Sequence, residues 1–95
     1  MRNEAAEYLA KARDLIAQAD AVLGIGLSDA AGRTAYLAEF HAAQGFIFEL
    51  TGKSLKSHRG VHTEFLRLTR DDGRIEPEIR IGLSQAYNLK AIADY

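Results

Sequence analysis

The chain contains no cysteine and no long apolar run, and each absence excludes a class of protein. Without cysteine there can be no disulfide, no thiolate metal ligand and no cysteine nucleophile, which fits a reducing compartment. No apolar segment approaches the roughly eighteen residues that span a bilayer. The N-terminal "MRNEAAEYLA" also lacks the basic-then-apolar order of a signal peptide. We therefore expect a cytoplasmic protein with no membrane partner.

Length and charge set further bounds. The 95 residues predict one domain over residues 1–95, of a size that buries roughly two-thirds of the unfolded chain's surface. Residues 1–52 carry four basic and seven acidic residues, a net charge of −3. Residues 53–80 carry seven basic and five acidic residues, a net charge of +2, and the charges of residues 81–95 cancel. The net charge of the whole chain is −1. An overall basic nucleic-acid binder is therefore disfavoured, whereas a local basic face remains open.

Apolar residues recur at intervals of three and four, the period of an amphipathic helix, in four segments. The predicted helices cover residues 3–23, 28–51 and 57–69, and a fourth begins at Pro77. There is no alternating strand pattern and no internal repeat. The fold class expected is therefore all-α: an antiparallel up-and-down bundle of four helices, or five.

The ends of these helices carry recognisable signals. Asn3, Ser28 and Ser57 are residue types that cap helix N-termini, and Pro77 suits an early helical position. No glycine, asparagine or proline stops the last helix between Leu89 and the end of the sequence. We expect this helix to run further in the natural protein.

The second predicted helix is apolar over most of its circumference, so it should be covered on several sides. It should be the central helix of the bundle, or carry an oligomer contact on one flank. Its main stripe consists of Tyr36, Phe40, Ala43, Ile47 and Leu50, and the candidate dimer flank consists of Leu37, His41 and Phe48.

The stretch "KSLKSHRGVH" holds two of the three histidines and three of the twelve basic residues, with no acid. With Ser57 as cap, His58 and His62 share one face of the third helix, next to Lys56 and Arg59. The N-terminus of a helix carries a partial positive charge, which attracts anions and repels basic side chains. Because several basic side chains nevertheless occur at this terminus, we infer that they bind an external anion such as phosphate. One alternative is that this stretch is a solvent-exposed connection with no ligand. Another is that the His-x-x-x-His spacing binds a metal ion, but no third ligand is evident, so we expect neither a metal nor a cofactor.

The sequence "RTAYLAEFHAAQGFIFELTGKSLKSHRGVHTEF", followed by "LSQAYNLKAIADY", resembles HEPN-domain proteins over residues 5–95. The resemblance is to a bacterial branch of the HEPN-domain proteins. Its members carry three motifs in order, approximately R-x-A-Y-Y-A-x-F-H-A-A, then K-T-H-S-G-V, then R-x-x-A-D-Y. The matching landmarks are Arg33, Ala35, Tyr36, Phe40, His41, Ala42 and Ala43; Lys56, Ser57, His58, Gly60 and Val61; and Ala93, Asp94 and Tyr95.

This resemblance implies a helical bundle that is usually dimeric and often encoded beside a small nucleotidyltransferase in a toxin–antitoxin-like pair. Many relatives are metal-independent ribonucleases with an Arg-x4–6-His motif. That motif does not transfer, because seven residues separate Arg33 from His41 and two separate Arg59 from His62. Lys90 replaces the arginine of the last motif, and lysine cannot grip a phosphate with two parallel hydrogen bonds.

Two functions follow as hypotheses. The first is a binding module, a homodimer that engages a nucleotidyltransferase partner, a nucleotide or RNA without cleaving it. The second is a metal-independent ribonuclease toxin in which His58 or His62 acts with a basic residue. The catalytic residues stay unassigned. The candidate anion, nucleotide or RNA contacts are Lys56, His58, Arg59, His62, Lys90, Asp94 and Tyr95.

Overall fold

The computed structural model describes the backbone of residues 1–93 and the side chains of residues 1–88. It contains four helices: α1 (Asn3–Gly24), α2 (Ser28–Thr51), α3 (His58–Thr69) and α4 (Pro77–Ala93). No β-strand occurs in residues 1–93. The all-α class expected from the sequence is thus confirmed. None of the helices in this part of the chain has the length and apolar character that crossing a membrane requires.

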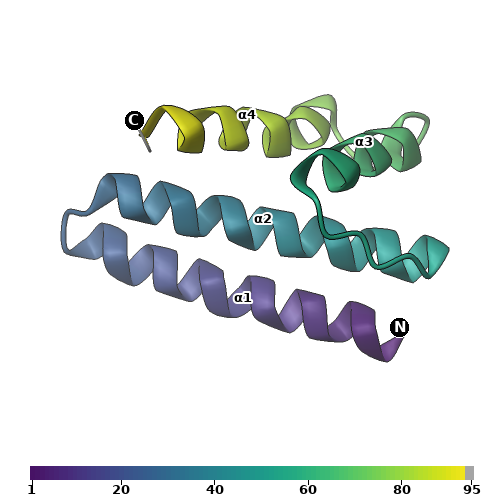
Figure 1. Cartoon of the computed structure of the whole chain (residues 1–95), viewed down its shortest axis with the longest axis horizontal. Coiled ribbons are helices and arrows are strands. Elements are labelled where there is room, and N and C mark those ends of the chain that lie inside the picture. The colour runs from purple at the N-terminus through teal and green to yellow at the C-terminus, as the bar shows by residue number, and fades with distance from the viewer. Residues whose placement is uncertain (94–95) are drawn as a thin grey trace.

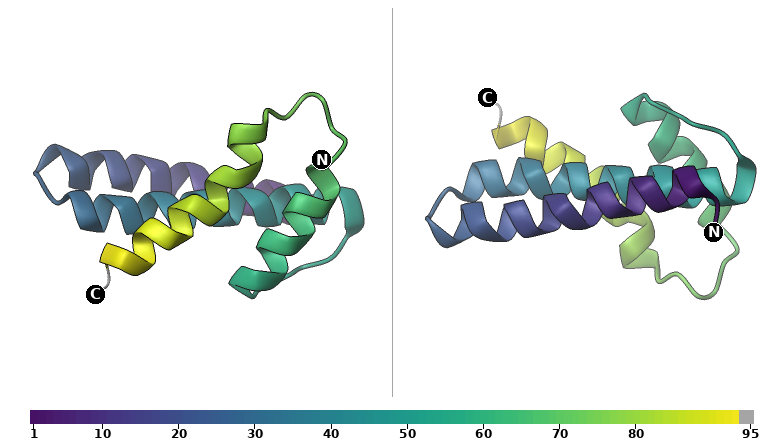
Figure 2. Two further views of the ribbon diagram at one scale, coloured as in Figure 1. Left: turned by 90° about the horizontal axis from the view of Figure 1, so that it is seen from above. Right: turned by 90° about the horizontal axis from the view of Figure 1, so that it is seen from below.

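The other three helices all pack against α2. Helices α1 and α2 form a long antiparallel hairpin, and α3 and α4 lie on the other side of α2 (Figure 1). Seen from above, the loop of residues 52–57 runs back beside α2 to the start of α3 (Figure 2). In the same view α3 and α4 both cross α2 obliquely. Helix α2 therefore contacts all three other helices, as its broad apolar surface requires.

The core forms where α3 and α4 cross α2. Four residues of the predicted α2 stripe are buried there, whereas Leu50 is 54% exposed. Val61 of α3 and Leu83 of α4 complete the buried cluster, and partly buried Phe65 and Leu68 pack against it. Ile79, one turn before Leu83 on α4, lies outside this cluster and is 58% exposed.

Helix α1 packs through small residues. Ala5, Ala12 and Ala19 are buried against α2, but the larger Ile16 and Leu23 of the same helix are mostly exposed. The reason lies in how closely the two helices approach. A Cβ atom placed on Gly45 would lie 3.2 Å from the carbonyl oxygen of Ala5. At this separation the alanine positions fill the seam, and the larger side chains are directed to its edges.

Two of the three predicted caps are wrong. Arg2 and Leu27 occupy the N-cap positions of α1 and α2, and neither makes a side-chain cap bond. The backbone N–H of Arg2 instead donates to the carboxylate of Glu49 at 2.9 Å, so a tertiary contact holds the start of α1. The Ser57 cap of α3 is confirmed, because its Oγ accepts from the Gly60 N–H at 2.9 Å.

We expect Ser57→Ala to lower the free energy of unfolding by about 1 kcal/mol, because it removes the acceptor for a helix-terminal N–H group. Ser28→Ala is the matched control at the start of α2, where no side-chain cap bond exists. Urea unfolding curves of both variants measure the difference. Equal effects at Ser57 and Ser28 would contradict the assigned cap.

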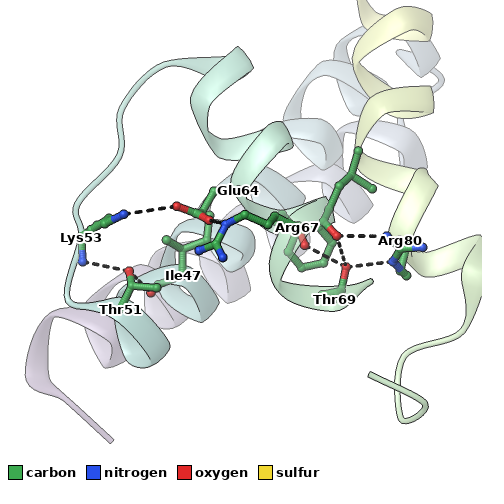
Figure 3. Close-up of polar contacts among 9 residues, drawn as sticks. Ile47, Thr51, Lys53, Glu64, Arg67, Thr69 and Arg80 are labelled. Carbon is green, nitrogen blue, oxygen red and sulfur yellow. Dashed lines mark hydrogen bonds and ion pairs between the residues drawn. The ribbon is translucent and has the colours of Figure 1, made fainter. Parts of the chain in front are cut away.

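Polar contacts hold the middle and the C-terminal end of α3 in place (Figure 3). Near its middle, Glu64 pairs with Arg67 and lies 3.6 Å from the ammonium of Lys53 in the preceding loop. At its C-terminal end, Arg80 of α4 donates to the hydroxyl of Thr69 and to the carbonyl of Leu66, both at 3.0 Å. These contacts fix α3 relative to the preceding loop and to α4.

Candidate functional site

Side chains of three helices meet at the N-terminal end of α3. The hydroxyl of Tyr36 on α2 lies 2.5 Å from Nδ1 of His58 and 3.0 Å from Nε2 of His62. Tyr87 of α4 completes the group, with its ring centroid 5.1 Å from that of His58 and 5.5 Å from that of His62. We call these four residues the Tyr–His cluster.

Burial decreases across the Tyr–His cluster. The Tyr36 residue is completely buried, His62 and Tyr87 are half-buried, and His58 is exposed. The ring of Phe40 supports the exposed histidine, with centroids 4.7 Å apart. His58 is therefore the member of the cluster that is most exposed to solvent, while the Tyr36 phenol that it contacts belongs to the core.

The surroundings shift two pKa values in opposite directions. Burial, with smaller contributions from Tyr87 and Glu39, raises the pKa of the Tyr36 phenol, so this group is neutral. Burial first and the neighbouring His58 second lower the pKa of His62 below its ordinary value of 6.5. Both effects favour uncharged side chains in the inner part of the cluster.

The predicted contact residues divide into separate groups around the start of α3. His58 and His62 face Tyr36. Arg59 borders a different hollow of about 450 Å³, on a face of α3 that also carries Thr63 and Arg67. Lys56 borders a third hollow of about 410 Å³, between α1 and the loop before α3. The structure therefore brings the two histidines together at Tyr36 and places Lys56 and Arg59 at two separate hollows.

The side chains of the last three predicted contacts lie outside the part of the chain that the structure describes. Lys90 lies on α4, three residues after Tyr87, but its side chain falls outside the described part of the chain. Asp94 and Tyr95 lie outside the described residues altogether.

The candidate dimer flank is partly covered within the chain. Tyr8 of α1 stacks on His41 with ring centroids 6.5 Å apart and lies at the same distance from Phe48. His41 also hydrogen-bonds Gln44 at 2.6 Å. Of the three predicted interface residues, Leu37 is exposed, at 38%. The other two pack within the chain, so the exposed part of this flank is smaller than the sequence indicates.

Metal binding has little support in the geometry. Nδ1 of His58 and Nε2 of His62 are both within hydrogen-bond distance of the Tyr36 hydroxyl. Within the described residues, His, Asp and Glu side chains nowhere gather in a group of three or more that could hold a metal ion. Two histidines alone fall short of the three or four protein ligands that zinc sites use.

Two features of this region could not be located from sequence spacing. The first is the pairing of Tyr36 with both histidines, over separations of 22 and 26 residues. The sequence contains one indication of this pairing, a tyrosine within an apolar stripe. A tyrosine buried there needs a hydrogen-bond partner for its hydroxyl, but the sequence does not identify the partner. The second is an apolar groove of about 660 Å³ that lies between α2 and α4 and includes Ala42, Phe46 and Ile79.

The chain was compared with models of protein families, with curated proteins and with solved structures, and none of them matches it.

Proposed function

We propose that the chain is a HEPN-like helical module that binds single-stranded RNA at the N-terminal end of α3. The observation that supports this most is the hydrogen bonding of His58 and His62 to the Tyr36 hydroxyl at a helix start flanked by Lys56 and Arg59. Imidazole, lysine and arginine side chains all bind phosphate oxygens, and the free N–H groups of a helix start add to this attraction.

The separation of the cationic groups favours a chain of phosphates over a single one. Lys56 and Arg59 border different hollows, so each would contact a different phosphate. Successive phosphates of an extended strand can contact separate points. The exposed imidazole of His58 and the half-buried ring of Tyr87 also provide aromatic surfaces, and bases of single strands stack on such rings.

The resemblance to HEPN proteins extends the proposal to partners. We propose that the chain forms a homodimer and that a small nucleotidyltransferase is its partner in a toxin–antitoxin-like pair. Exposed Leu37 supports a contact on this flank of α2. Acidic residues predominate in residues 1–52, so RNA should approach from the side of α3.

A metal-independent ribonuclease is the second candidate. One observation favours it: two imidazoles share one hydroxyl, and general acid–base cleavage of RNA needs a proton donor and a proton acceptor close together. Against it, the Arg-x4–6-His spacing is missing, and the two imidazole nitrogens that face Tyr36 are already engaged with its hydroxyl. Binding without cleavage is therefore the better-supported function.

A binding and cleavage assay in chelator separates the two. Fluorescently labelled ten-nucleotide oligouridylate is titrated with the protein, and the same samples are run on a denaturing gel. We expect anisotropy to rise while the RNA stays intact. Cleavage that is lost in His58→Ala or His62→Ala would establish the ribonuclease instead. RNA that neither binds nor is cleaved would contradict both.

A further inference from the structure

The Tyr–His cluster restricts how many protons its two imidazoles can take up. The Tyr36 hydroxyl has one proton to donate and two lone pairs that accept. It lies within hydrogen-bond distance of one nitrogen on each of His58 and His62. When both histidines are neutral, the hydroxyl donates to one imidazole, and the other imidazole donates its N–H to the phenol oxygen.

The first added proton fits this arrangement. The imidazole that already donates to Tyr36 can be protonated at its other ring nitrogen, and both hydrogen bonds remain. For His58 this second nitrogen is Nε2, on a residue that is exposed to solvent. One imidazolium next to one neutral imidazole is thus fully compatible with the geometry.

The second added proton does not fit. It must go onto the nitrogen that accepts the Tyr36 proton, which removes this acceptor and leaves the buried hydroxyl proton without a partner. It also places two positive rings with their centroids 6.4 Å apart. Repulsion between them is already evident, because His58 lowers the pKa of His62.

Among the side chains of residues 1–88, the titratable groups around the pair make no hydrogen bond to either imidazole that would offset this cost. On α2, the Tyr36 phenol is neutral, and Glu39 acts on it by raising its pKa. On α4, Tyr87 contacts both imidazoles through its ring. At the start of α3, Lys56 and Arg59 add positive charge, but each borders a separate hollow that also contains carboxylates: Glu4 and Glu7 beside Lys56, and Glu64 beside Arg59. A carboxylate bonded to either imidazole is not found among the side chains of residues 1–88.

We propose that Tyr36 is a positioning residue that limits the His58–His62 pair to one added proton until the pH falls well below that of the first uptake, so that between the two uptakes the cluster offers one imidazolium beside one neutral imidazole to an RNA phosphodiester. The single positive charge matches a phosphodiester, which carries one negative charge per phosphate. The RNA part rests on the proposed function. The proton limit is a property of the free protein and can be measured without any ligand.

The direct test follows the ring nitrogens of both histidines by NMR between pH 4 and 9. In the natural protein we expect two proton uptakes separated by more than about one pH unit, since coupled groups titrate as a pair. In Tyr36→Phe, which keeps the buried ring and removes the hydroxyl, the separation should shrink and the second uptake should move to higher pH.

Tyr87→Phe is the matched control, because it removes a hydroxyl from the same cluster with no hydrogen bond to either imidazole. It should retain the wide separation. Simultaneous titration of both histidines in the natural protein would overturn the proposal, and this result does not depend on any variant folding. An unchanged separation in Tyr36→Phe would also overturn the role of Tyr36.

The RNA arm uses labelled oligouridylate, whose phosphodiesters keep a constant charge over this pH range. Above the first uptake, affinity should fall by up to about tenfold per pH unit, because one proton is linked to binding. A slope of two protons in the natural protein would contradict the one-proton limit. If RNA fails to bind at every pH, the proposed function is wrong, while the nitrogen titration still decides the proton limit.

Discussion

Replacing Ile47 by alanine is expected to lower the free energy of unfolding by about 3 kcal/mol, a large share of the 5–15 kcal/mol typical of natural domains. Ile47 is completely buried in the cluster that joins α2, α3 and α4. Truncation leaves a cavity at the crossing point, where neighbours from three helices cannot all move inward. Guanidinium unfolding followed by circular dichroism measures the loss.

Two further substitutions make this result interpretable. Leu50→Ala removes a side chain of similar size from the same helix. Because Leu50 is 54% exposed, this substitution should lower the free energy of unfolding by less than about 1 kcal/mol. Ile47→Val removes one methylene group and should cost about 1 kcal/mol if the alanine variant is too unstable to fold. Equal losses at positions 47 and 50 would mean that α2 is not the buried centre of the fold.

The combined charge reversal Lys56→Glu with Arg59→Glu is expected to weaken RNA binding on the order of 10- to 100-fold at about 0.1 M salt. Each residue loses a phosphate contact and gains repulsion. The logarithm of the affinity should also depend less steeply on the logarithm of salt concentration, by about 1.4 for two lost contacts to a single strand. Anisotropy titrations at several salt concentrations measure both quantities.

Its matched control carries the same change in net charge elsewhere. Arg13→Glu with Arg70→Glu alters two exposed residues, one on α1 and one at the C-terminal end of α3. This variant should retain most of the affinity and most of the salt slope. If both double variants lose affinity equally, binding follows overall charge, and the start of α3 is not the site.

The helices could be predicted from the sequence because their signals are local. Apolar intervals of three and four marked each helix, and Gly52 ended α2 with a left-handed backbone, at φ 74°. The caps at Asn3 and Ser28 could not be settled in this way. Arg2 reaches Glu49, a residue 47 positions away, and this tertiary contact replaces a local cap at the start of α1.

The site was predictable only in part for the same reason. The positions of His58 and His62 on one face followed from their spacing of four residues. Their partner Tyr36 was placed in the core by its apolar stripe, and nothing local indicated which polar groups its hydroxyl would contact. The distribution of Lys56 and Arg59 into separate hollows depends on the path of the loop before α3, which periodicity does not determine.

The most direct test of the RNA site is chemical-shift mapping of the isotope-labelled protein with unlabelled oligouridylate in chelator. We expect the largest shifts at the His58 and His62 ring nitrogens and at the backbone amides of residues 56–62. The amides in the middle of α1 should remain unchanged. Shifts concentrated on α1 or in the groove that contains Ile79, with the two imidazoles unaffected, would contradict an RNA site at the start of α3.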